Sequence, residues 1–169
     1  MTLQTKTIEM GMSTIGLLEK NQVKVVDILN KVLANEFVLS VKTRNYHWNV
    51  IGPNFSELHK FFDEQYGQLD DIIDQVAERS RALGEKSIAT MTEFMVKTSL
   101  KEKPKQYPDA LQMVFNLLQD HKVIIRNLRK DLETCASEYN DMGTSNFLTD
   151  LMEKHEKMAW MLRAFLEVK

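Results

Sequence analysis

The stretch Tyr46–Gly84 reads YHWNVIGPNFSELHKFFDEQYGQLDDIIDQVAERSRALG and holds two of the four histidines together with a dense set of carboxylates. Its apolar residues recur at helical spacing from about residue 55 to residue 83. Asn54 precedes this pattern and Gly84 follows it, and these residue types commonly begin and end helices. We therefore predict one long helix, capped by Asn54 in a capping box with Glu57 and stopped at Gly84.

Three further long segments show apolar residues at alternating spacings of three and four. They cover about residues 21–45, 109–139 and 144–168. With only six glycines and three prolines in 169 residues, the sequence favours an all-α protein, and four such segments predict a ferritin-like four-helix bundle.

The connection between the second and third long segments, residues 85–107, is too long to stay without structure. The sequence TMTEFMVKTS within it predicts a short extra helix in this crossover. No linker composition divides the chain, so we expect one domain over residues 1–169, with residues 1–20 forming an N-terminal extension.

Composition narrows the function classes. Lysine and arginine (22) nearly balance aspartate and glutamate (24), and a net charge of −2 gives nucleic acid no electrostatic footprint. The single cysteine, Cys135, fits a reducing compartment, and on an apolar seam it is expected to be inert. No apolar run is long enough to cross a membrane, and we expect a cytoplasmic protein.

The carboxylates of the second long helix share one face with His59. At about 100° per residue, with His59 at zero, Asp63 falls near 40°, Asp74 near 60° and Glu78 near 100°. The apolar residues of this helix lie between roughly 220° and 300° on the same count, so the carboxylate stripe points away from the core. A solvated polar face is the simple alternative.

This placement argues against a di-iron site inside the bundle, since such sites use Glu-x-x-His pairs and the sequence has none. His121 and His155 lie on apolar seams. The seams supply no carboxylate beside them, so we interpret both as hydrogen-bonded core histidines.

Length imposes a condition on any metal site along the stripe. His59 and Asp74 are 15 residues apart in the sequence, which corresponds to about 22 Å along a helix. Metal bonds to nitrogen and oxygen are only about 2.0–2.2 Å. One chain therefore cannot close the site, whereas two antiparallel copies across a two-fold axis can bring His59 and Asp63 against the other chain's Asp74 and Glu78.

Two neighbouring residues fit this arrangement. Gly67 lies near the midpoint of the stripe, where a mid-helix glycine suits close approach of two helices. His47, at the end of the first long helix, can join the histidine half of each site.

At this point the sequence resembles the Dps family of mini-ferritins. The shared pattern is H-W-x10-H-x3-D-x10-D-x3-E, and the resemblance extends from about Leu29 to the C-terminal WMLRAFLE. The residues that carry the pattern are His47, Trp48, His59, Asp63, Asp74 and Glu78. The resemblance implies a dodecameric shell whose ferroxidase centres lie at two-fold interfaces between subunits.

By the same resemblance, His47, His59 and Asp63 of one subunit face Asp74 and Glu78 of the next and bind Fe(II). Family members oxidise this iron with hydrogen peroxide, or with O2, store the ferric mineral and so protect the cell. Imidazole and carboxylate ligands suit non-haem iron and also admit zinc. Trp48 would lie near the iron and intercept oxidising equivalents, with aromatic packing at an interface as the alternative.

Two features depart from the family. The first 20 residues contain only two lysines, so we expect no basic DNA-binding tail, and a nucleoid-compacting role is the weaker alternative function. The segment KTSLKEKPKQ is interpreted as a solvated loop. Members of the family line an iron-entry pore with aspartates near the start of the last helix, and Asn146 stands here at a position where an aspartate is common. Asp141 and Asp150 are the candidates for this pore, with a capping role as the alternative for Asp141. A purely structural helical oligomer is a third hypothesis.

Overall fold

The computed structural model describes residues 15–166 and contains five helices in this range. They are α1 (Glu19–Asn49), α2 (Phe55–Ala82), α3 (Met91–Lys97), α4 (Ala110–Ser137) and α5 (Met142–Ala164). The four long helices and the short one in the crossover confirm the predicted all-α bundle, with helix ends within a few residues of the predicted ones.

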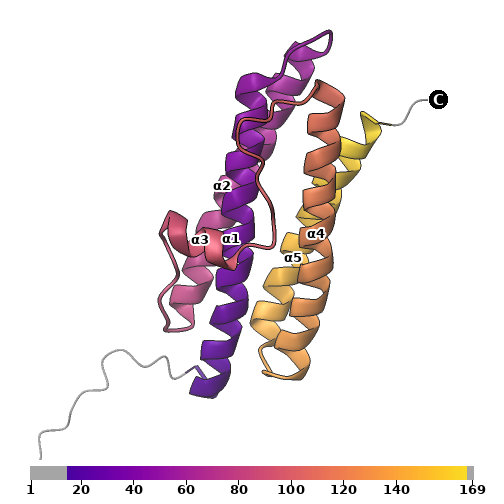
Figure 1. Cartoon of the computed structure of the whole chain (residues 1–169). Helices are drawn as coiled ribbons and strands as arrows, with labels where there is room; N and C mark the ends of the chain where they lie inside the picture. The colour runs from indigo at the N-terminus through magenta and orange to yellow at the C-terminus, as the bar shows by residue number, and fades with distance from the viewer. Residues whose placement is uncertain (1–14, 167–169) are drawn as a thin grey trace, which may run out of the picture.

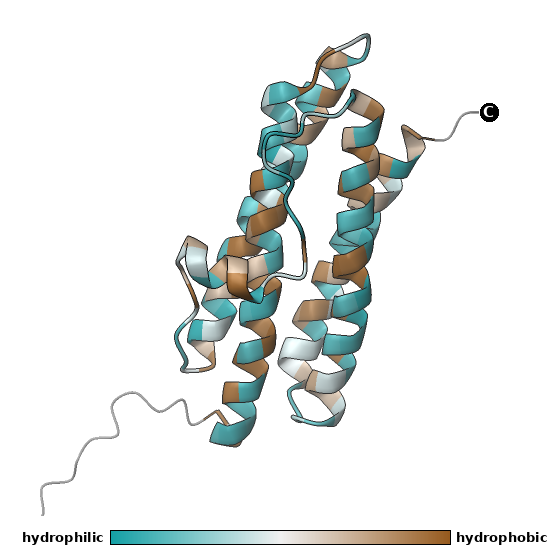
Figure 2. Ribbon diagram, in the orientation of Figure 1, coloured by the Kyte–Doolittle hydropathy of each residue, from teal (hydrophilic) through white to brown (hydrophobic). Residues whose placement is uncertain are grey.

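The bundle consists of two helical hairpins packed side by side (Figure 1). α1 packs mainly against α2, and α4 mainly against α5, while α1 and α4 hold the hairpins together. Apolar residues recur along each long helix (Figure 2), and those facing the centre are fully buried, among them Leu29, Leu69, Leu117 and Leu151. Burying the apolar stripe of every helix in one core is what selects this architecture.

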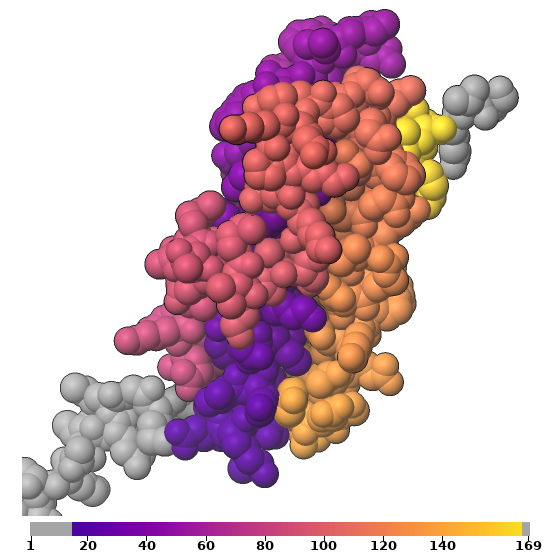
Figure 3. Space-filling view, in the orientation of Figure 1, coloured from indigo at the N-terminus to yellow at the C-terminus, as the bar shows by residue number. Residues whose placement is uncertain are grey.

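The crossover from α2 to α4 lies over the outside of α1 (Figures 1 and 3). α3 begins with a complete capping box between Thr90 and Glu93. Its Phe94 is buried and stacks on Phe37 of α1, with ring centroids 4.4 Å apart. Just after α3, the backbone N–H of Ser99 donates a hydrogen bond of 2.7 Å to the side-chain amide oxygen of Asn35. Buried polar contacts as well as apolar ones therefore hold the crossover in place.

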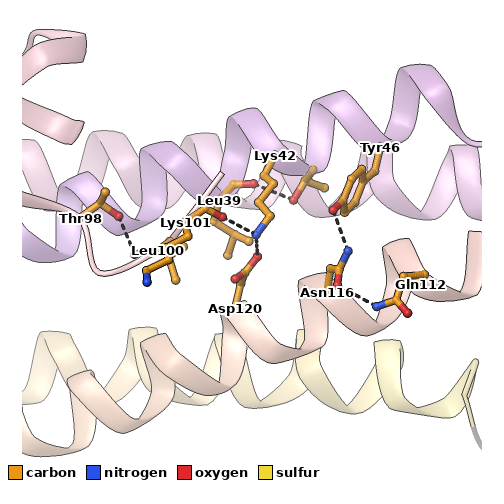
Figure 4. A network of polar contacts seen from close by, with 10 residues as sticks. Leu39, Lys42, Tyr46, Thr98, Leu100, Lys101, Gln112, Asn116 and Asp120 are labelled. Carbon is orange, nitrogen blue, oxygen red and sulfur yellow. Dashed lines mark hydrogen bonds and ion pairs between the residues drawn. The ribbon is translucent and has the colours of Figure 1, made fainter. Parts of the chain in front are cut away.

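A polar network ties the C-terminal half of α1 to α4 and the crossover (Figure 4). Lys42 forms an ion pair with Asp120 and donates to the Lys101 carbonyl at 3.1 Å. One turn later, the hydroxyl of Tyr46 accepts a hydrogen bond from Asn116 at 3.0 Å. These contacts hold the last turn of α1, which carries His47, in a defined position.

The predicted capping box at the start of α2 is wrong. Asn54 is the N-cap residue, but its side chain makes no capping hydrogen bond. Its backbone, at φ −100° and ψ 26°, lies outside the extended region from which N-cap side chains reach the first turn. The predicted stop is confirmed, because Gly84 follows α2 with φ +94°, a left-handed conformation that favours glycine.

α1 begins at Glu19, so the predicted extension does not reach residue 20, and residues 1–14 lie outside the described range. Between residues 15 and 166, no helix combines the length and the apolar character that a membrane span requires.

Candidate metal centre

The candidate centre is built on a pair of histidines at the junction of α1 and α2. His47 lies in the last turn of α1 and His59 in the second turn of α2, and the connection of residues 50–54 folds one back onto the other. Their rings stack with centroids 3.8 Å apart and planes inclined by 19°. Nδ1 of His47 lies 2.7 Å from the His59 carbonyl oxygen, and Nδ1 of His59 lies 2.9 Å from the His47 carbonyl oxygen.

These reciprocal contacts determine which ring nitrogens are free. A carbonyl oxygen only accepts hydrogen bonds, so each Nδ1 carries the proton and each Nε2 keeps a lone pair. Metal-binding histidines are commonly fixed in this way, with one N–H donated to a backbone carbonyl and the other nitrogen bound to the ion. The pair is therefore held in the tautomer that a metal requires before any metal arrives.

Asp63 lies one turn after His59 and faces the same centre. Its Oδ1 is 4.0 Å from Nε2 of His47. Since that nitrogen holds a lone pair, two electron-rich atoms face each other across this gap. With metal bonds of about 2.0–2.2 Å, adjacent ligand atoms of one ion lie about 3 Å apart, and ligand atoms on opposite sides of it lie about 4 Å apart. Oδ1 of Asp63 and Nε2 of His47 therefore have the separation of two ligands on opposite sides of one ion. Asp63 thus lies beside His47, whose ring stacks on His59.

Tyr66 and Arg44 support Asp63, and neither was singled out in the sequence. The Tyr66 hydroxyl donates to Oδ1 of Asp63, and its ring meets His47 edge-on with centroids 5.4 Å apart. Arg44 lies over the Tyr66 ring at 4.4 Å and pairs with Asp70. The only sequence signal was the spacing of three residues between Asp63 and Tyr66, which places them on one helix face.

Asp74 and Glu78 lie along the same outer face of α2, far from the histidines of their own chain. Both are exposed, as is Asp63, so the predicted outward direction of the stripe is correct. No group of three or more histidine, cysteine, aspartate or glutamate side chains within residues 15–166 is arranged to hold a metal ion. A Cβ added to Gly67 would meet no atom within 4 Å, so this part of the face is open.

Trp48 projects from the end of α1 beside the histidine pair and is 72% exposed. Ile51 and Phe55, on either side of the turn, are also exposed, and the Phe55 ring stacks on His59 with centroids 5.1 Å apart. Apolar surface therefore borders the histidines on the side open to solvent.

Asp141 is a structural cap in this chain. It is 4% exposed, and its carboxylate accepts the backbone N–H and the hydroxyl of Thr144 at 2.8 and 2.6 Å. Arg79 contacts the same carboxylate at 3.3 Å. A carboxylate enclosed in this way is not available to line a pore, so the capping interpretation replaces the pore interpretation. Asp150 is exposed and pairs with Lys154.

His121 and His155 are completely buried, and their Nδ1 atoms lie 2.9 Å apart, which agrees with their interpretation as core histidines. The expectation that no carboxylate lies beside them is wrong. Glu36 of α1 is also completely buried, and its Oε1 is 3.0 Å from Nε2 of His155. The apolar pattern of α1 hid Glu36, since an isolated glutamate between valines and leucines gives no sign of facing inward.

Comparison with known proteins first identifies the class of protein to which the chain belongs. A family model described as the ferritin-like domain matches residues 26–168. The chain is therefore a ferritin-like protein, in agreement with the bundle and its crossover.

Individual relatives narrow the class. The chain is 38% identical over 144 residues to DNA protection during starvation protein 2 of Bacillus anthracis, covering 85% of this chain and 97% of that protein. It is 46% identical over 153 residues to a low temperature-induced protein of Nostoc, covering 90% and 86%.

Solved structures agree with these matches. A Dps protein of Vibrio cholerae O1 matches with a TM-score of 0.86 and 34% identity, covering 94% of this chain and 98% of that one. A Dps protein of Bacillus brevis matches with a TM-score of 0.83 and 36% identity, covering 89% and 100%. The chain belongs to the Dps family.

Proposed function

We propose that this protein is an iron-storing mini-ferritin that oxidises Fe(II) at centres shared between two subunits. The observation that carries the proposal is the reciprocal Nδ1-to-carbonyl contact of His47 and His59, which leaves both Nε2 atoms free, that of His47 at 4.0 Å from Asp63. The Vibrio cholerae relative is described as a member of a superfamily of ferritin-like diiron-carboxylate proteins, which supports iron as the metal.

Each centre takes its second half from another copy of the chain. Asp74 and Glu78 lie about 22 Å or more from His59 along α2, and an antiparallel copy of α2 brings them against the histidine half. Two equivalent centres then form per dimer. The open face at Gly67 and the exposed apolar residues Trp48, Met95 and Val96 suit burial between subunits, and we extend the assembly to a dodecameric shell.

The chemistry follows from the ligands. Imidazole nitrogens and carboxylates hold Fe(II) with positions left open for an oxidant. Two Fe(II) ions each give one electron to one hydrogen peroxide molecule, whose O–O bond breaks, and with water they yield ferric oxyhydroxide and protons. The carboxylates stabilise the more highly charged ferric product. O2 is the alternative oxidant, and zinc, which takes the same ligands, is expected to occupy the centre without redox chemistry.

The test replaces the distant half of the site. In the variant Asp74→Ala/Glu78→Ala, anaerobic Fe(II) titration should lose the tight binding step, and peroxide should no longer drive fast oxidation. The matched control, Glu102→Ala/Glu133→Ala, removes the same charge from exposed positions outside α2 and should behave as the unaltered protein. Unchanged iron oxidation in the first variant would leave only a solvated stripe on a structural oligomer.

DNA protection, which the names of several relatives state, is the competing role. In KTSLKEKPKQ, Lys97 pairs with Asp27, and the remaining lysines lie on an exposed loop with Glu102 among them. We therefore expect only weak DNA binding that vanishes between low and physiological salt, since contacts to phosphate weaken steeply with salt. A mobility-shift assay at both salt concentrations distinguishes the two roles.

A further inference from the structure

One layer of the bundle interior is polar and incompletely satisfied. Glu36 of α1, His121 of α4 and His155 of α5 are buried in contact with one another, and the buried Gln65 of α2 contacts the Met158 carbonyl one turn after His155. Six buried side-chain atoms in residues 15–166 lack a hydrogen-bond partner, and five of them belong to these four residues. They are both carboxylate oxygens of Glu36, Oε1 of Gln65 and the Nε2 atoms of both histidines. Since buried polar groups are nearly always satisfied, so many in one layer indicate a missing ligand.

The charge of Glu36 points to a cation. Its side chain is 0% exposed, and the ion pairs of the described residues give it no lysine or arginine partner. A buried carboxylate without a cationic partner is strongly unfavourable. Among residues 15–166, the basic group that lies beside it is the imidazole of His155.

The geometry of this pair fits two ligands of one ion. Nε2 of His155 and Oε1 of Glu36 are 3.0 Å apart, yet they do not satisfy the angular requirements of a hydrogen bond. Two atoms bound to a common ion aim their lone pairs at a point beside the line that joins them. With metal bonds of about 2.0–2.2 Å, adjacent ligand atoms lie about 3 Å apart.

The other two residues complete this environment. Nδ1 of His121 lies 2.9 Å from Nδ1 of His155, so it can accept the proton of that ring and leave Nε2 of His155 free for an ion. The amide nitrogen of Gln65 donates to the carbonyl of Met158 at 3.4 Å, and Met158 lies one turn after His155 on α5. This hydrogen bond leaves the amide oxygen of Gln65 free.

We propose that the interior of each subunit holds a second metal site, in which Glu36 and His155 bind a divalent transition ion such as Zn²⁺. The pair supplies two ligands, and the amide oxygen of Gln65 and water supply the rest. His121 acts as the positioning residue that fixes the His155 tautomer. The site lies within one chain, contains no residue of the interface centre, and needs no redox reaction.

The experiment removes the interface centre first. In the assembled variant His59→Ala/Asp74→Ala/Glu78→Ala, prolonged incubation with Zn²⁺ alone followed by gel filtration and elemental analysis should leave one zinc per subunit. Adding Glu36→Gln should abolish this zinc. Adding Asp131→Asn, which alters a half-buried carboxylate whose Oδ2 also lacks a partner, should preserve it. Because the background lacks the interface ligands, the outcome does not depend on whether the proposed ferroxidase activity exists.

A second measurement covers the case in which Glu36→Gln fails to fold. Crystals of the unaltered protein soaked in Zn²⁺, measured at the zinc absorption edge, should show an anomalous peak bonded to Glu36 and His155. A crystal with zinc at the interface centre and no peak in the interior would overturn the proposal. Zinc retained equally by the Glu36→Gln protein would overturn it as well.

Discussion

His47 and His59 hold each other through their main chains, because each Nδ1 contacts the backbone carbonyl oxygen of the other residue. Replacing one side chain therefore leaves the carbonyl that orients the other. We expect His59→Ala to lower the affinity for Zn²⁺ by at least about 10-fold, since a ligand is worth no less than the outer contacts that orient it. The ring of His47 should keep its proton on Nδ1, which nitrogen chemical shifts report. A change of His47 tautomer in this variant would contradict the main-chain mechanism.

Sharing of the centre between two chains predicts complementation. Subunits carrying His47→Ala/His59→Ala lack one half of each centre, and subunits carrying Asp74→Ala/Glu78→Ala lack the other. Each variant alone should fail to oxidise iron quickly. After co-refolding of equal amounts, half of the dimers are mixed and each mixed dimer has one complete centre, so about a quarter of the normal activity should return. Activity of the mixture no greater than that of the separate variants would exclude shared centres.

Tyr66 provides a pH-dependent signal at the same centre. Its hydrogen bond to Asp63 is the main cause that raises the pKa of the phenol, because the bond favours the protonated form. In Asp63→Ala the phenolate should therefore form at lower pH than in the unaltered protein. Absorbance at the phenolate band measures this, with Tyr66→Phe subtracted to remove the other tyrosines. Glu64→Ala, on the same helix, is the control and should leave the titration unchanged.

Much of the fold could be predicted because its main driving force, the burial of apolar stripes, leaves a periodic pattern in the sequence. The same pattern predicted the helix ends and the helix in the crossover, and glycine served as the stop signal. The capping box predicted between Asn54 and Glu57 does not form, because the backbone conformation of Asn54 depends on how the chain leaves α1, which no local residue pattern records. The capping box of α3, between Thr90 and Glu93, lies in the segment that was predicted to form the short helix.

The residues of the histidine half could also be identified from the sequence, because His59 and Asp63 lie on one helical face. Its finer features were not, because they depend on contacts between helices. The support of Asp63 by Tyr66 and Arg44 spans α1 and α2, and the inward direction of Glu36 depends on which side of α1 the other hairpin covers. Asp141 was ambiguous for the same reason: only the fold brings Arg79 beside it.

Asp141 should act on stability and leave iron oxidation alone. Its carboxylate caps α5 through Thr144 and contacts Arg79. Asp141→Ala removes the cap and an ion-pair partner, and we expect a loss of about 1–3 kcal/mol in the free energy of unfolding. Chemical denaturation measures it. Asp141→Asn, which keeps an oxygen for the Thr144 N–H, should lose less, and an iron-entry role would instead appear as slower iron uptake at normal stability.

Asp131 predicts that the stability of the fold depends on pH in a definite direction. Burial raises the pKa of this carboxyl, with Lys31 and Lys130 acting in the opposite direction, and its Oδ2 has no hydrogen-bond partner. The folded state then binds its proton more tightly than the unfolded state does. The ionised group therefore destabilises the fold at neutral pH, and this cost disappears as the pH falls through the raised pKa.

Asp131→Asn removes the charge at every pH. Its melting temperature relative to the unaltered protein should therefore be highest at neutral pH and should decline as the pH falls through the raised pKa of Asp131, where the carboxyl takes up its proton. The exposed Asp71→Asn is the matched control, and its difference from the unaltered protein should vary less over this range. A constant difference for Asp131→Asn would show that Lys31 and Lys130 compensate the burial of the carboxylate.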